Sequence, residues 1–406
     1  MRILLITQYF WPENFKINSL CLELKNNGHD IFVLTGLPNY PTGKISAGYS
    51  FWKNNNQTWN GIKIYRSKLI PRFSGKGVNL FFNYISFALF ASIKLLFSIK
   101  QKPDLIFVYE PSPITVGIPA IVAKCKFKNV PIIFWVQDLW PDSLKDTGAF
   151  DNKFILNAVD KLTRYIYNKS DLILVQSEAF TEYIIKQGIP SNKIKYFPNP
   201  TEKFYNVTEV ELAYSKLFPI GFNLIFAGNI GEAQSFGTLI EAAYKLKQLK
   251  YPIYWNIFGD GRAREQFNRR VIEMDLNDNF IFKGTFKSEE MPSLFANADA
   301  LVVSLKKSKI FSLTIPAKVQ SYLACGKPII GSIDGEGARI IIEAQAGLVS
   351  ASEDVDNLVS NIIKLYNLSE IKRETLGLNG RAYFEKEFSM EILIGKLENI
   401  FESKIA

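Results

Sequence analysis

The sequence has little histidine and little cysteine. Its 406 residues include one histidine and three cysteines. His29 lies in Gly28-His29-Asp30, between an expected helix end and an expected strand, a position typical of a structural rather than a catalytic histidine. With no second histidine, we expect neither a hydrolytic triad nor a histidine-based metal site. Cys21, Cys125 and Cys325 are far apart in apolar or helical contexts, which indicates reduced core thiols in a cytoplasmic protein.

Acidic residues are missing from the segment between Ile31 and Pro103, which contains no Asp or Glu. The formal net charge of the chain is +9, and this segment carries the imbalance. Such a basic belt is typical of proteins that meet anionic lipid headgroups or nucleic acid. No nucleic-acid-binding motif accompanies it, so we expect a membrane surface as its partner and no nucleic acid. The cations of the belt are Lys44, Lys53, Lys63, Arg66, Lys68, Arg72, Lys76, Lys94, Lys100 and Lys102.

The apolar segment Leu80–Phe97 lacks the uninterrupted apolar length of a typical membrane span, because Asn83, Ser86, Ser92 and Lys94 interrupt it. A further strand is expected soon after it, at Leu105, and a helix that left the bilayer on the far side could not return to the same sheet. Two interpretations stay open: a helix buried on the sheet, or a helix lying in the membrane plane with its aromatic side in lipid. We favour the second.

The amino terminus, MRILLITQYF, has too short an apolar run for a signal peptide and is expected to form a first strand. Short apolar strands then alternate with helical segments, which predicts an α/β protein with doubly wound parallel sheets. We expect two Rossmann-like domains that face each other across a cleft. The first covers 1–203 and is completed by a helix at 386–406; the second covers 204–385. The expected strands are 3–6, 31–34, 61–66, 105–108, 131–136, 172–175, 224–227, 254–258, 280–283, 300–303 and 328–330.

The stretch from Ser308 to Val349 is the most informative part of the second domain. It predicts a loop closed by Pro316, a helix ending at Gly326, a strand, a glycine turn at 335–337 and a second helix from Ala338. This order places two helix N-termini at the carboxyl edge of a parallel sheet, where α/β proteins bind phosphorylated ligands. Lys318, one turn into the first helix, adds a positive charge. The stretch therefore predicts a site for a diphosphate.

Complete dinucleotide-binding fingerprints are absent, although Gly228-Asn229-Ile230-Gly231 and Gly259-Asp260-Gly261 each follow an expected strand. These turns supply backbone N–H groups, which again suits phosphates. Asp354-Val355-Asp356 resembles an Asp-x-Asp metal motif, but it precedes an apolar helix. We interpret it as an acidic helix N-terminus, and we predict no metal site.

Polar residues at the ends of the first-domain strands are the candidates for chemistry in that domain. A buried strand delivers Gln137 and Asp138 to its carboxyl end, and Asp138 serves there either as a base and hydrogen-bond orienter or as a cap of the next helix. Glu110 ends the neighbouring strand and has the same possible role. Asn14 and Lys16 lie in the loop after the first strand.

The order of these motifs resembles the retaining GT-B glycosyltransferases of family 4, and most closely the branch of bacterial O-antigen, capsule and colanic-acid transferases that includes fucosamine transferases. The resemblance implies transfer of a sugar from a nucleotide diphosphate sugar, held by the second domain, to an acceptor held by the first, with no metal or other cofactor. The stretches that carry it are WVQDLWPDS at 135–143, IFAGNIGEAQ at 225–234, FGDG at 258–261, KGTF at 283–286 and the run from Pro316 to Pro328.

The chain departs from that family at several positions. The usual glutamate pair falls near Leu313 and Ser321, and the usual Arg and Lys fall at Asn229 and Gln234. A diphosphate therefore depends on Lys318, with Lys306 or Lys307 as helpers. Gln137 replaces a common histidine, which moves the base role to Asp138. We take Asp138 and Lys318 as catalytic. The resemblance implies an acceptor held by the first domain, and we assign to that side Asn14, Lys16, Glu110 and Gln137. The donor residues are Gly228, Asn229, Gly259, Lys306, Thr314, Lys318, Ser321, Glu336, Gly337 and Arg339.

These patterns predict a metal-independent glycosyltransferase of the hexosyltransferase type on the inner face of the cell membrane. It would move a sugar, of the N-acetylfucosamine kind, from a UDP-linked donor to a lipid-linked oligosaccharide in O-antigen or capsule synthesis. Two alternatives stay open: a non-catalytic nucleotide-sugar or lipid-diphosphate binding protein, and a GT-B epimerase. The position of His29 argues against the epimerase, and the basic, aromatic belt favours a lipid-linked acceptor.

Overall fold

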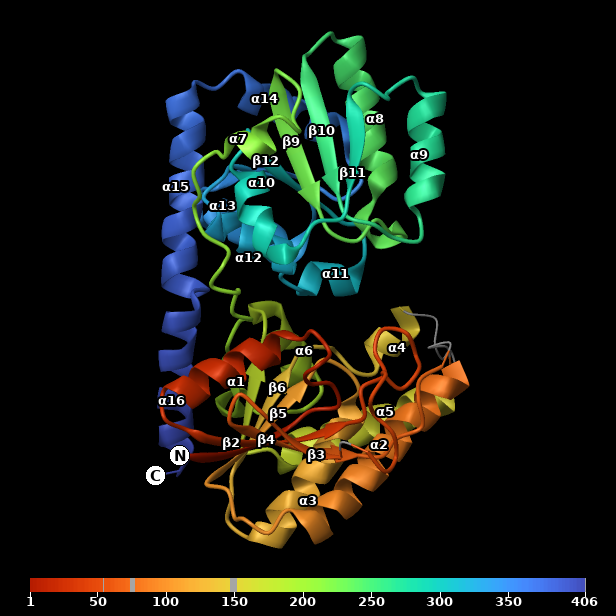
Figure 1. Cartoon of the computed structure of the whole chain (residues 1–406), viewed down its shortest axis with the longest axis vertical. Helices are drawn as coiled ribbons and strands as arrows, with labels where there is room; N and C mark the ends of the chain where they lie inside the picture. The colour runs from red at the N-terminus through yellow and green to blue at the C-terminus, as the bar shows by residue number, and fades with distance from the viewer. Residues whose placement is uncertain (54, 74–76, 147–151, 406) are drawn as a thin grey trace. The chain divides into compact units, whose positions relative to one another are not determined.

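The computed structural model of the chain describes residues 1–53, 55–73, 77–146 and 152–405. They form two compact α/β units, Met1–Pro200 with Leu393–Ala406, and Thr201–Ile392. We call them unit 1 and unit 2 and describe each by itself; Figure 1 labels their elements. The boundaries expected from the sequence lie at residues 203 and 386, whereas the units change at Pro200 and within α16 (Met390–Ile405).

Unit 1 contains one mixed sheet in the order β3-β4-β2-β1-β5-β6-β7-β8. Every neighbouring pair is parallel except the hairpin of β3 and β4. The strands are β1 (Arg2–Ile6), β2 (Asp30–Gly36), β3 (Asn56–Trp59), β4 (Ile62–Ser67), β5 (Leu105–Glu110), β6 (Ile132–Val136), β7 (Leu172–Val175) and β8 (Ile194–Tyr196). The helices are α1 (Lys16–Asn26), α2 (Gly77–Ser98), α3 (Gly117–Phe127), α4 (Asp142–Asp146), α5 (Lys153–Lys169) and α6 (Glu178–Lys186).

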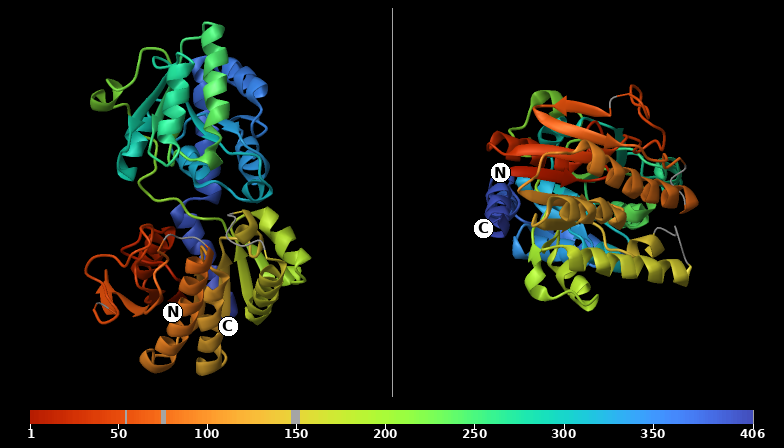
Figure 2. Two further views of the ribbon diagram at one scale, coloured as in Figure 1. Left: turned by 90° about the vertical axis from the view of Figure 1, so that its right-hand side faces the viewer. Right: turned by 90° about the horizontal axis from the view of Figure 1, so that it is seen from below.

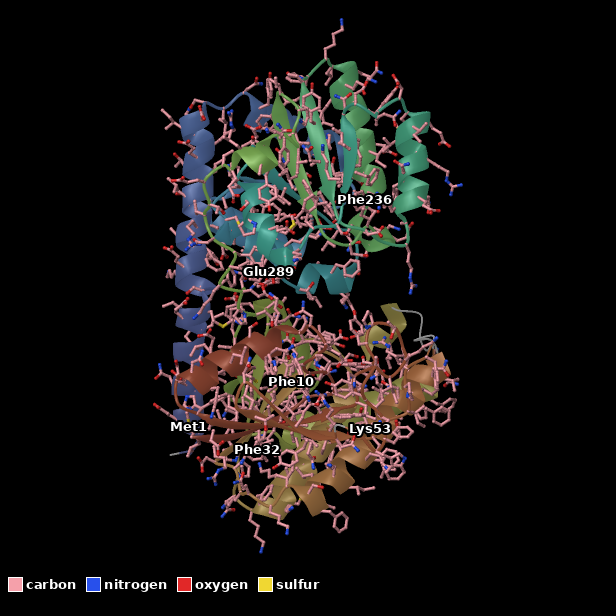
Figure 3. All side chains as sticks on the ribbon, viewed as in Figure 1. Met1, Phe10, Phe32, Lys53, Phe236 and Glu289 are labelled. Atoms are coloured by element: carbon pink, nitrogen blue, oxygen red, sulfur yellow. The ribbon has the colours of Figure 1, made fainter. Side chains whose placement is uncertain are left out.

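Helices cover both faces of the unit 1 sheet. On one face, Phe134 of β6 contacts Tyr167 of α5, with 5.8 Å between ring centroids. On the other face, Phe107 of β5 contacts Phe401 of α16 at 5.2 Å. Every residue of β5 and β6 is buried, which is the pattern expected of central strands in a doubly wound sheet. Phe10 and Phe32, labelled in Figure 3, are buried in the same unit. Cys21 is buried as predicted, whereas Cys125, on α3, is exposed, so its predicted place in the core is wrong.

Unit 2 contains an all-parallel sheet in the order β11-β10-β9-β12-β13-β14. Its largest apolar core joins this sheet to α8, α9 and α14, and Phe236 at the start of α8 belongs to it (Figure 3). The strands are β9 (Phe222–Ala227), β10 (Ile253–Phe258), β11 (Phe280–Gly284), β12 (Ala300–Ser304), β13 (Ile329–Ser332) and β14 (Gly347–Ser350). The helices are α7 (Leu212–Ser215), α8 (Phe236–Gln248), α9 (Arg264–Glu273), α10 (Met291–Phe295), α11 (Lys309–Leu313), α12 (Ala317–Ala324), α13 (Gly335–Glu343), α14 (Val355–Tyr366) and α15 (Glu370–Glu387).

The predicted α/β class with doubly wound sheets is confirmed, and all eleven ranges predicted as strands overlap strands of the structure. No pattern in the sequence predicted β3, β8 and β14. All three lie at sheet edges and are only partly buried, so they lack the apolar runs that mark central strands. The predicted glycine turn at 335–337 is wrong, because these residues form the first turn of α13. A Cβ on Gly335 would lie 1.9 Å from the Ser312 carbonyl oxygen, so the glycine permits close packing rather than a flexible loop.

Helix α2 contains the segment whose placement the sequence left open. By length and composition it could cross a membrane, but it connects β4 to β5 and packs on α3, β4 and β2; both views of Figure 2 show it beside α3. Its inner side is buried, including Phe87, Ala91 and Leu95. The interpretation of a helix packed on the sheet is therefore confirmed for this side. The membrane contact of the outer side stays a prediction.

Hydrogen bonds, as well as apolar contacts, hold the inner side of α2. Asn83 is fully buried; its Nδ2 donates to the Ile70 carbonyl oxygen at 2.6 Å, and its Oδ1 accepts from Gln8 Nε2 at 2.6 Å. We predict that Asn83→Leu destabilises the protein by about 2–4 kcal/mol in urea unfolding, although it makes the helix more apolar, because two buried groups lose their partners. Leu89→Ala, on the exposed side, should change stability little. Equal effects of the two variants would contradict this assignment of faces.

Candidate active site

Both sheets have a point where the strand order reverses: between β1 and β5 in unit 1, and between β9 and β12 in unit 2. In open α/β sheets, ligands bind outside the carboxyl ends of the strands at such points. The candidate residues of unit 2 follow β9, β12 and β13. Those of unit 1 follow β1, β5 and β6.

Two glycine turns of unit 2 fit closely against each other. Gly228 follows β9 and Gly259 follows β10, and both have positive φ angles, +133° and +132°. A Cβ on Gly259 would lie 1.9 Å from the Gly228 carbonyl oxygen. The Gly228 N–H donates to Phe258 O at 2.9 Å, and the Gly259 N–H donates to Gly284 O at 2.7 Å. Only glycine fits at these positions, and the turns bring bare backbone to the sheet edge.

Lys318 lies beside these turns, in the first turn of α12. Its Nζ is 3.5 Å from the centroid of the Phe226 ring, and a Cβ on Gly228 would lie 3.0 Å from the same Nζ. Within the described ranges, Lys318 makes no ion pair or side-chain hydrogen bond. Burial lowers the pKa of Lys318 to about 7, because a cation without a partner is costly away from water. An anion beside Nζ would stabilise its charge.

Two helix N-termini lie in the same part of unit 2, as the sequence predicts. Neither α12 nor α13 has a side-chain hydrogen bond from its N-cap, Pro316 or Asp334, so the first N–H groups of these helices are available to an anion. Gly337 of α13 has a packing role: a Cβ there would lie 2.9 Å from Pro316 Cδ and 2.8 Å from Ile333 Cδ1. The glycine thereby lets α13 approach the loop before α12.

The residues that replace the usual cationic pair interact with each other. Asn229 Nδ2 donates to Gln234 Oε1 at 3.5 Å, and the Gly231 N–H donates to the same oxygen at 3.2 Å. Lys306, a predicted helper, forms an ion pair with Glu232 at 2.8 Å. A phosphate would have to compete with Glu232 for Lys306, whereas Lys318 has no such competitor among the described residues.

Two hydroxyl residues assigned to the donor side bond to their own helices. Ser321 is buried, and its Oγ donates to the carbonyl oxygens of Lys318 at 3.1 Å and Ala317 at 3.3 Å. Thr314 ends α11, and its Oγ1 donates to Phe311 O at 3.1 Å. In this arrangement Ser321 points back along α12, so the structure gives no support to its predicted ligand contact.

Glu336 and Arg339 lie on α13 and bind each other. Arg339 donates from Nε and Nη2 to the Glu336 carboxylate at 3.0 and 2.9 Å, and from Nη1 to Glu343 at 2.8 Å. Glu336 is buried. A phosphate at Arg339, which we assigned to the donor side, would have to compete with these two carboxylates.

No cluster of three or more potential metal ligands occurs in the described residues. The interpretation of Asp354-Val355-Asp356 as a helix start is confirmed: Asp354 is the N-cap of α14 and accepts from the Asn357 N–H at 3.0 Å, and Asp356 pairs with Lys245.

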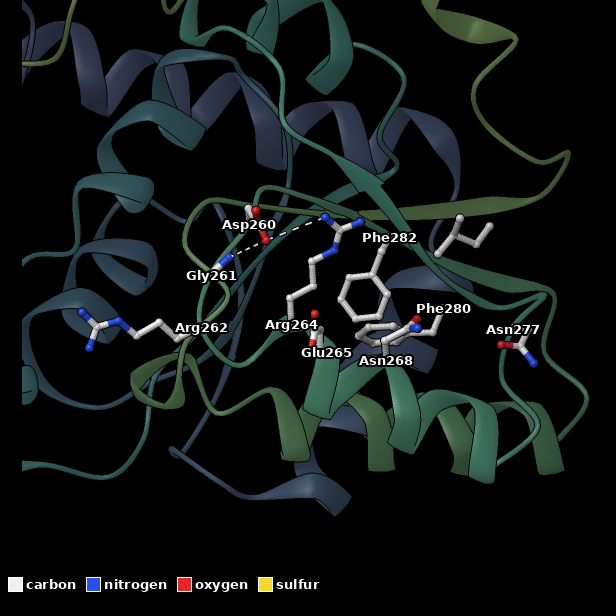
Figure 4. Close-up of a pocket in the computed structure, with 10 residues that line it drawn as sticks. Asp260, Gly261, Arg262, Arg264, Glu265, Asn268, Asn277, Phe280 and Phe282 are labelled. Atoms are coloured by element: carbon white, nitrogen blue, oxygen red, sulfur yellow. Dashed lines mark hydrogen bonds and ion pairs between the residues drawn. The ribbon is translucent and has the colours of Figure 1, made fainter. Parts of the chain in front are cut away.

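A pocket of about 830 Å³ lies along β11 and the start of α9 (Figure 4). In it, Asp260 accepts from the Gly261 N–H at 2.8 Å and pairs with Arg264 at 3.7 Å. Figure 4 shows Arg262 directed away from this pair. The pocket lies at an edge strand rather than at the switch point, and we assign no ligand to it.

In unit 1, Gln137 and Asp138 follow β6, as predicted. Asp138 Oδ1 accepts from Ser143 Oγ of α4 at 2.6 Å, and burial raises the pKa of Asp138 above its ordinary value. The carbonyl oxygen of Gln137 accepts from Gln176 Nε2 at 2.7 Å. One carboxylate oxygen of Asp138 therefore stabilises the turn before α4. The second carboxylate oxygen lies at the sheet edge.

Glu110, at the end of β5, is fully buried. Burial, and next the nearby Asp138 carboxylate, raise its pKa well above the ordinary value. Neither carboxyl oxygen makes a hydrogen bond of normal geometry within the described part of the chain, although the amides of Gln137 and Asp138 lie near enough to favour the charged form. Because no surface of Glu110 is accessible, its predicted direct contact with an acceptor is unsupported. It lies beneath the 137–140 turn instead.

The sequence analysis missed Glu13, in the loop after β1. Glu13 Oε1 accepts from the N–H groups of Asn39 at 2.8 Å and Tyr40 at 2.7 Å, whereas its buried Oε2 has no partner among the described residues. Burial raises the pKa of Glu13 to about 7. Two features of the sequence could have identified Glu13. It directly follows the Trp-Pro after the first strand, and it lies in the loop already selected for Asn14 and Lys16.

The predicted basic belt is wrong at Arg66. Its side chain is buried and donates to Gly36 O at 3.2 Å, to Gln57 Oε1 at 3.0 Å and to Trp11 O. Arg66 therefore joins β4 to the loop after β1 and cannot face lipid. Lys76, also in the belt, lies outside the described residues.

Of the other two residues assigned to the acceptor side, Asn14 lies in the same loop and Lys16 is the first residue of α1. Asn14 is exposed, and Lys16 Nζ donates to Pro200 O at 3.1 Å. Aromatic rings pack together near them: Tyr9 stacks on Phe15 at 5.2 Å, and Tyr40 contacts Phe15 at 5.4 Å. Tyr9 is buried, whereas Tyr40 is exposed, and an exposed aromatic ring can pack against a sugar.

Comparison with known families gives two matches that follow the two units. Residues 16–200 match the family described as glycosyl transferase 4-like domain, and residues 221–383 match the family described as glycosyl transferases group 1.

Relatives in sequence include WcaI of Escherichia coli strain K12, named as a colanic acid biosynthesis glycosyl transferase, at 23% identity over 80% of this chain and 82% of the relative. CapM of Staphylococcus aureus, a capsular polysaccharide biosynthesis glycosyltransferase, is 22% identical over 78% of this chain and 82% of its own length.

Among solved structures, Anabaena HepE in complex with UDP has a TM-score of 0.70 at 14% identity and covers 99% of this chain and 100% of its own. This likeness shows a shared fold. Together with the two family matches and the two Rossmann-like units, it shows that the chain belongs to the GT-B glycosyltransferases and is similar to bacterial colanic-acid and capsule transferases.

Proposed function

We propose that the chain transfers a hexose-type sugar, of the N-acetylfucosamine kind, from a UDP-linked donor to a lipid-linked oligosaccharide in the synthesis of a surface polysaccharide. The main observation for the donor side is Lys318. Its ammonium group makes no ion pair or side-chain hydrogen bond among the described residues, lies on the Phe226 ring, and is next to two glycine turns and two uncapped helix N-termini. HepE, which shares the fold, binds UDP and UDP-glucose, and this supports the choice of a UDP-linked donor.

In the proposed reaction, the bond between the sugar's anomeric carbon and the diphosphate breaks, a bond to the acceptor hydroxyl oxygen forms, and the proton of that hydroxyl passes to the Asp138 carboxylate. Negative charge grows on the leaving diphosphate. Lys318 and the N–H groups of α12 and α13 are oriented before reaction to stabilise that charge. The family resemblance favours retention of the anomeric configuration and a reaction without metal.

We assign the acceptor side to unit 1. Asp138 orients the attacking hydroxyl through its carboxylate, and the aromatic rings near Asn14 and Lys16 contact the acceptor sugar. A lipid-linked acceptor is confined to the membrane, so we place the protein as a peripheral protein on the inner face of the cell membrane. The basic segment between Ile31 and Pro103 supports this placement.

The test of the donor assignment is a binding panel of UDP-sugars and GDP-sugars, by calorimetry and thermal shift, on the wild type and Lys318→Met. We expect one UDP-sugar to bind the wild type and Lys318→Met to weaken binding by roughly 1.5–3 kcal/mol, the contribution typical of a charged hydrogen bond. Lys364→Met, which removes an exposed lysine of α14, is the matched control and should bind normally. Normal binding by Lys318→Met would refute the assignment.

The same assignment predicts how donor affinity depends on pH. The pKa of Lys318 is about 7 in the empty protein, and a bound diphosphate must raise it, because it stabilises the charged form. Affinity should therefore be constant below about pH 7 and fall above it, by at most tenfold per pH unit. Binding should take up a proton, which calorimetry in two buffers of different ionisation enthalpy measures. Lys318→Met should show neither effect.

Asp138→Asn separates the catalytic interpretation from the structural one. Asn can still accept the hydrogen bond from Ser143, so we expect little change in melting temperature but about a hundredfold or greater loss of transfer. Since the Ser143 hydrogen bond lowers the pKa of Asp138, Ser143→Ala should move the acid limb of kcat/KM to higher pH. A parallel loss of stability and activity in Asp138→Asn would indicate a structural residue.

Glu110→Gln tests whether Glu110 is a neutral, positioning residue. Its pKa is raised above the ordinary 4.5, so the folded state holds a proton that the unfolded state releases, and wild-type stability falls as pH rises from about 4.5 towards the folded pKa. Glu110→Gln should keep activity and gain stability relative to the wild type over that range. Glu110→Leu should lose activity, because leucine has no polar group that can interact with the 137–140 turn. A pH-independent difference in stability between the wild type and Glu110→Gln would contradict the neutral form.

A further inference from the structure

The outer side of α2 exposes an unusual amount of apolar surface. Leu89 is 56% exposed and Phe97 is 75% exposed. Single exposed apolar residues are ordinary, but a continuous apolar surface marks a site of interaction. The exposed large apolar residues of α2 are Val78, Phe81, Phe82, Ile85, Leu89, Phe90, Ile93, Leu96 and Phe97.

Two polar side chains of α2, those of Asn83 and Ser86, face the protein instead of water. Asn83 is buried, as described above, and Ser86 Oγ accepts from the Ile70 N–H at 2.9 Å. A helix on the surface of a water-exposed domain has the opposite arrangement, with its polar side outward. Packing within unit 1 therefore does not account for the apolar outer side.

The path of the chain fixes α2 along the surface of unit 1. It connects β4 to β5, which belong to one sheet, and Figure 1 shows it on the outer side of that unit. Its carboxyl end is held by Lys126 of α3, whose Nζ donates to Leu95 O at 3.0 Å, Leu96 O at 2.8 Å and Ile99 O at 2.6 Å. A helix held in this way can lie on a bilayer but cannot cross it while the sheet stays intact.

Positive charges occur on α2 and in the chain on both sides of it. Lys94 is on α2, Lys100 and Lys102 follow it, and Lys68 precedes it, with its Nζ 3.7 Å from the centroid of the exposed Trp52 ring. No acidic residue occurs between Ile31 and Pro103. Anionic headgroups complement these charges, whereas a second copy of the chain would bring the same cations face to face. The charge pattern favours a lipid surface over self-association.

We propose that the outer side of α2 docks in the boundary between headgroups and acyl chains of an anionic bilayer, with the helix axis in the membrane plane and Lys68, Lys94 and Lys100 on the headgroups. This inference deepens the proposed function, since the acceptor is confined to the same plane. Tyr84 of α2 contacts Trp140, at 5.9 Å between ring centroids, in the turn that carries Asp138. Docking would therefore place the acceptor side of unit 1 one helix away from lipid.

The test is sedimentation of the full chain with vesicles, without donor or acceptor, so that it is independent of the transferase assignment. We expect binding to vesicles of equal parts phosphatidylcholine and phosphatidylglycerol, and weaker binding to phosphatidylcholine alone. Raising the ionic strength from about 0.01 M to about 1 M, which shortens the Debye length from about 30 Å to about 3 Å, should remove most of the charge-dependent part. Lys68→Ser, Lys94→Ser and Lys100→Ser together should have the same effect as salt.

The apolar part is tested by Phe82→Ser, Leu89→Ser and Phe97→Ser together, which should lower vesicle binding by about tenfold or more even at high salt. The matched control is Ile371→Ser with Leu378→Ser, two exposed apolar residues of α15, and it should bind like the wild type. Near-UV circular dichroism checks that each variant is folded.

A second measurement does not depend on the serine variants folding. Leu89→Trp should be quenched by brominated lipid in vesicles, and Leu378→Trp should not. Absence of vesicle sedimentation at low salt, or equal quenching at the two positions, would overturn the proposal. So would a change in oligomeric state of the α2 serine variant in sedimentation velocity, since that would assign the surface to self-association.

Discussion

Burial of both sheets on both faces is the constraint on which the candidate site depends. Strands such as β5 and β6 have no exposed residue, so the side chains available for chemistry are those at strand ends. All strands but β3 run parallel within their sheets, and their carboxyl ends therefore gather the turns after β1, β5 and β6 in unit 1, and after β9, β10 and β12 in unit 2.

Three titratable groups at these edges lack partners that such groups usually have in a folded protein. Among the described residues, Lys318 has no acidic neighbour, Glu110 is enclosed without a hydrogen bond of normal geometry, and one carboxylate oxygen of Glu13 has no partner. Each of these groups is less stable in its charged form than it would be in water. A site that is incomplete without its ligand has this property, and it connects the energetics of the empty protein with the proposed binding of a diphosphate and a hydroxyl.

At the surface of unit 1, the outer side of α2 also lacks favourable partners. Hydrogen bonds of Asn83 and Ser86 hold its inner side. Its outer side exposes apolar residues to water, and this exposure has a free-energy cost. Contact with lipid would remove that cost. The helix would then link the membrane plane to the turn that carries Asp138, through Tyr84 and Trp140.

The sequence by itself determined the α/β class, the central strands, the two domains and the gathering of Lys318 with Gly228 and Gly259, because apolar runs, glycine turns and their order are local signals. It left out the edge strands β3, β8 and β14, whose burial is partial. Only the tertiary structure decided which assigned residues are free to act. Ser321 bonds to its own helix, Arg339 is occupied by Glu336 and Glu343, Arg66 is buried rather than exposed to lipid, and Glu13 is enclosed at the acceptor side. These outcomes depend on partners far away in the chain or on the pitch of a helix. They could not be predicted, because a residue's type and its neighbours in sequence do not encode the three-dimensional position of its partner.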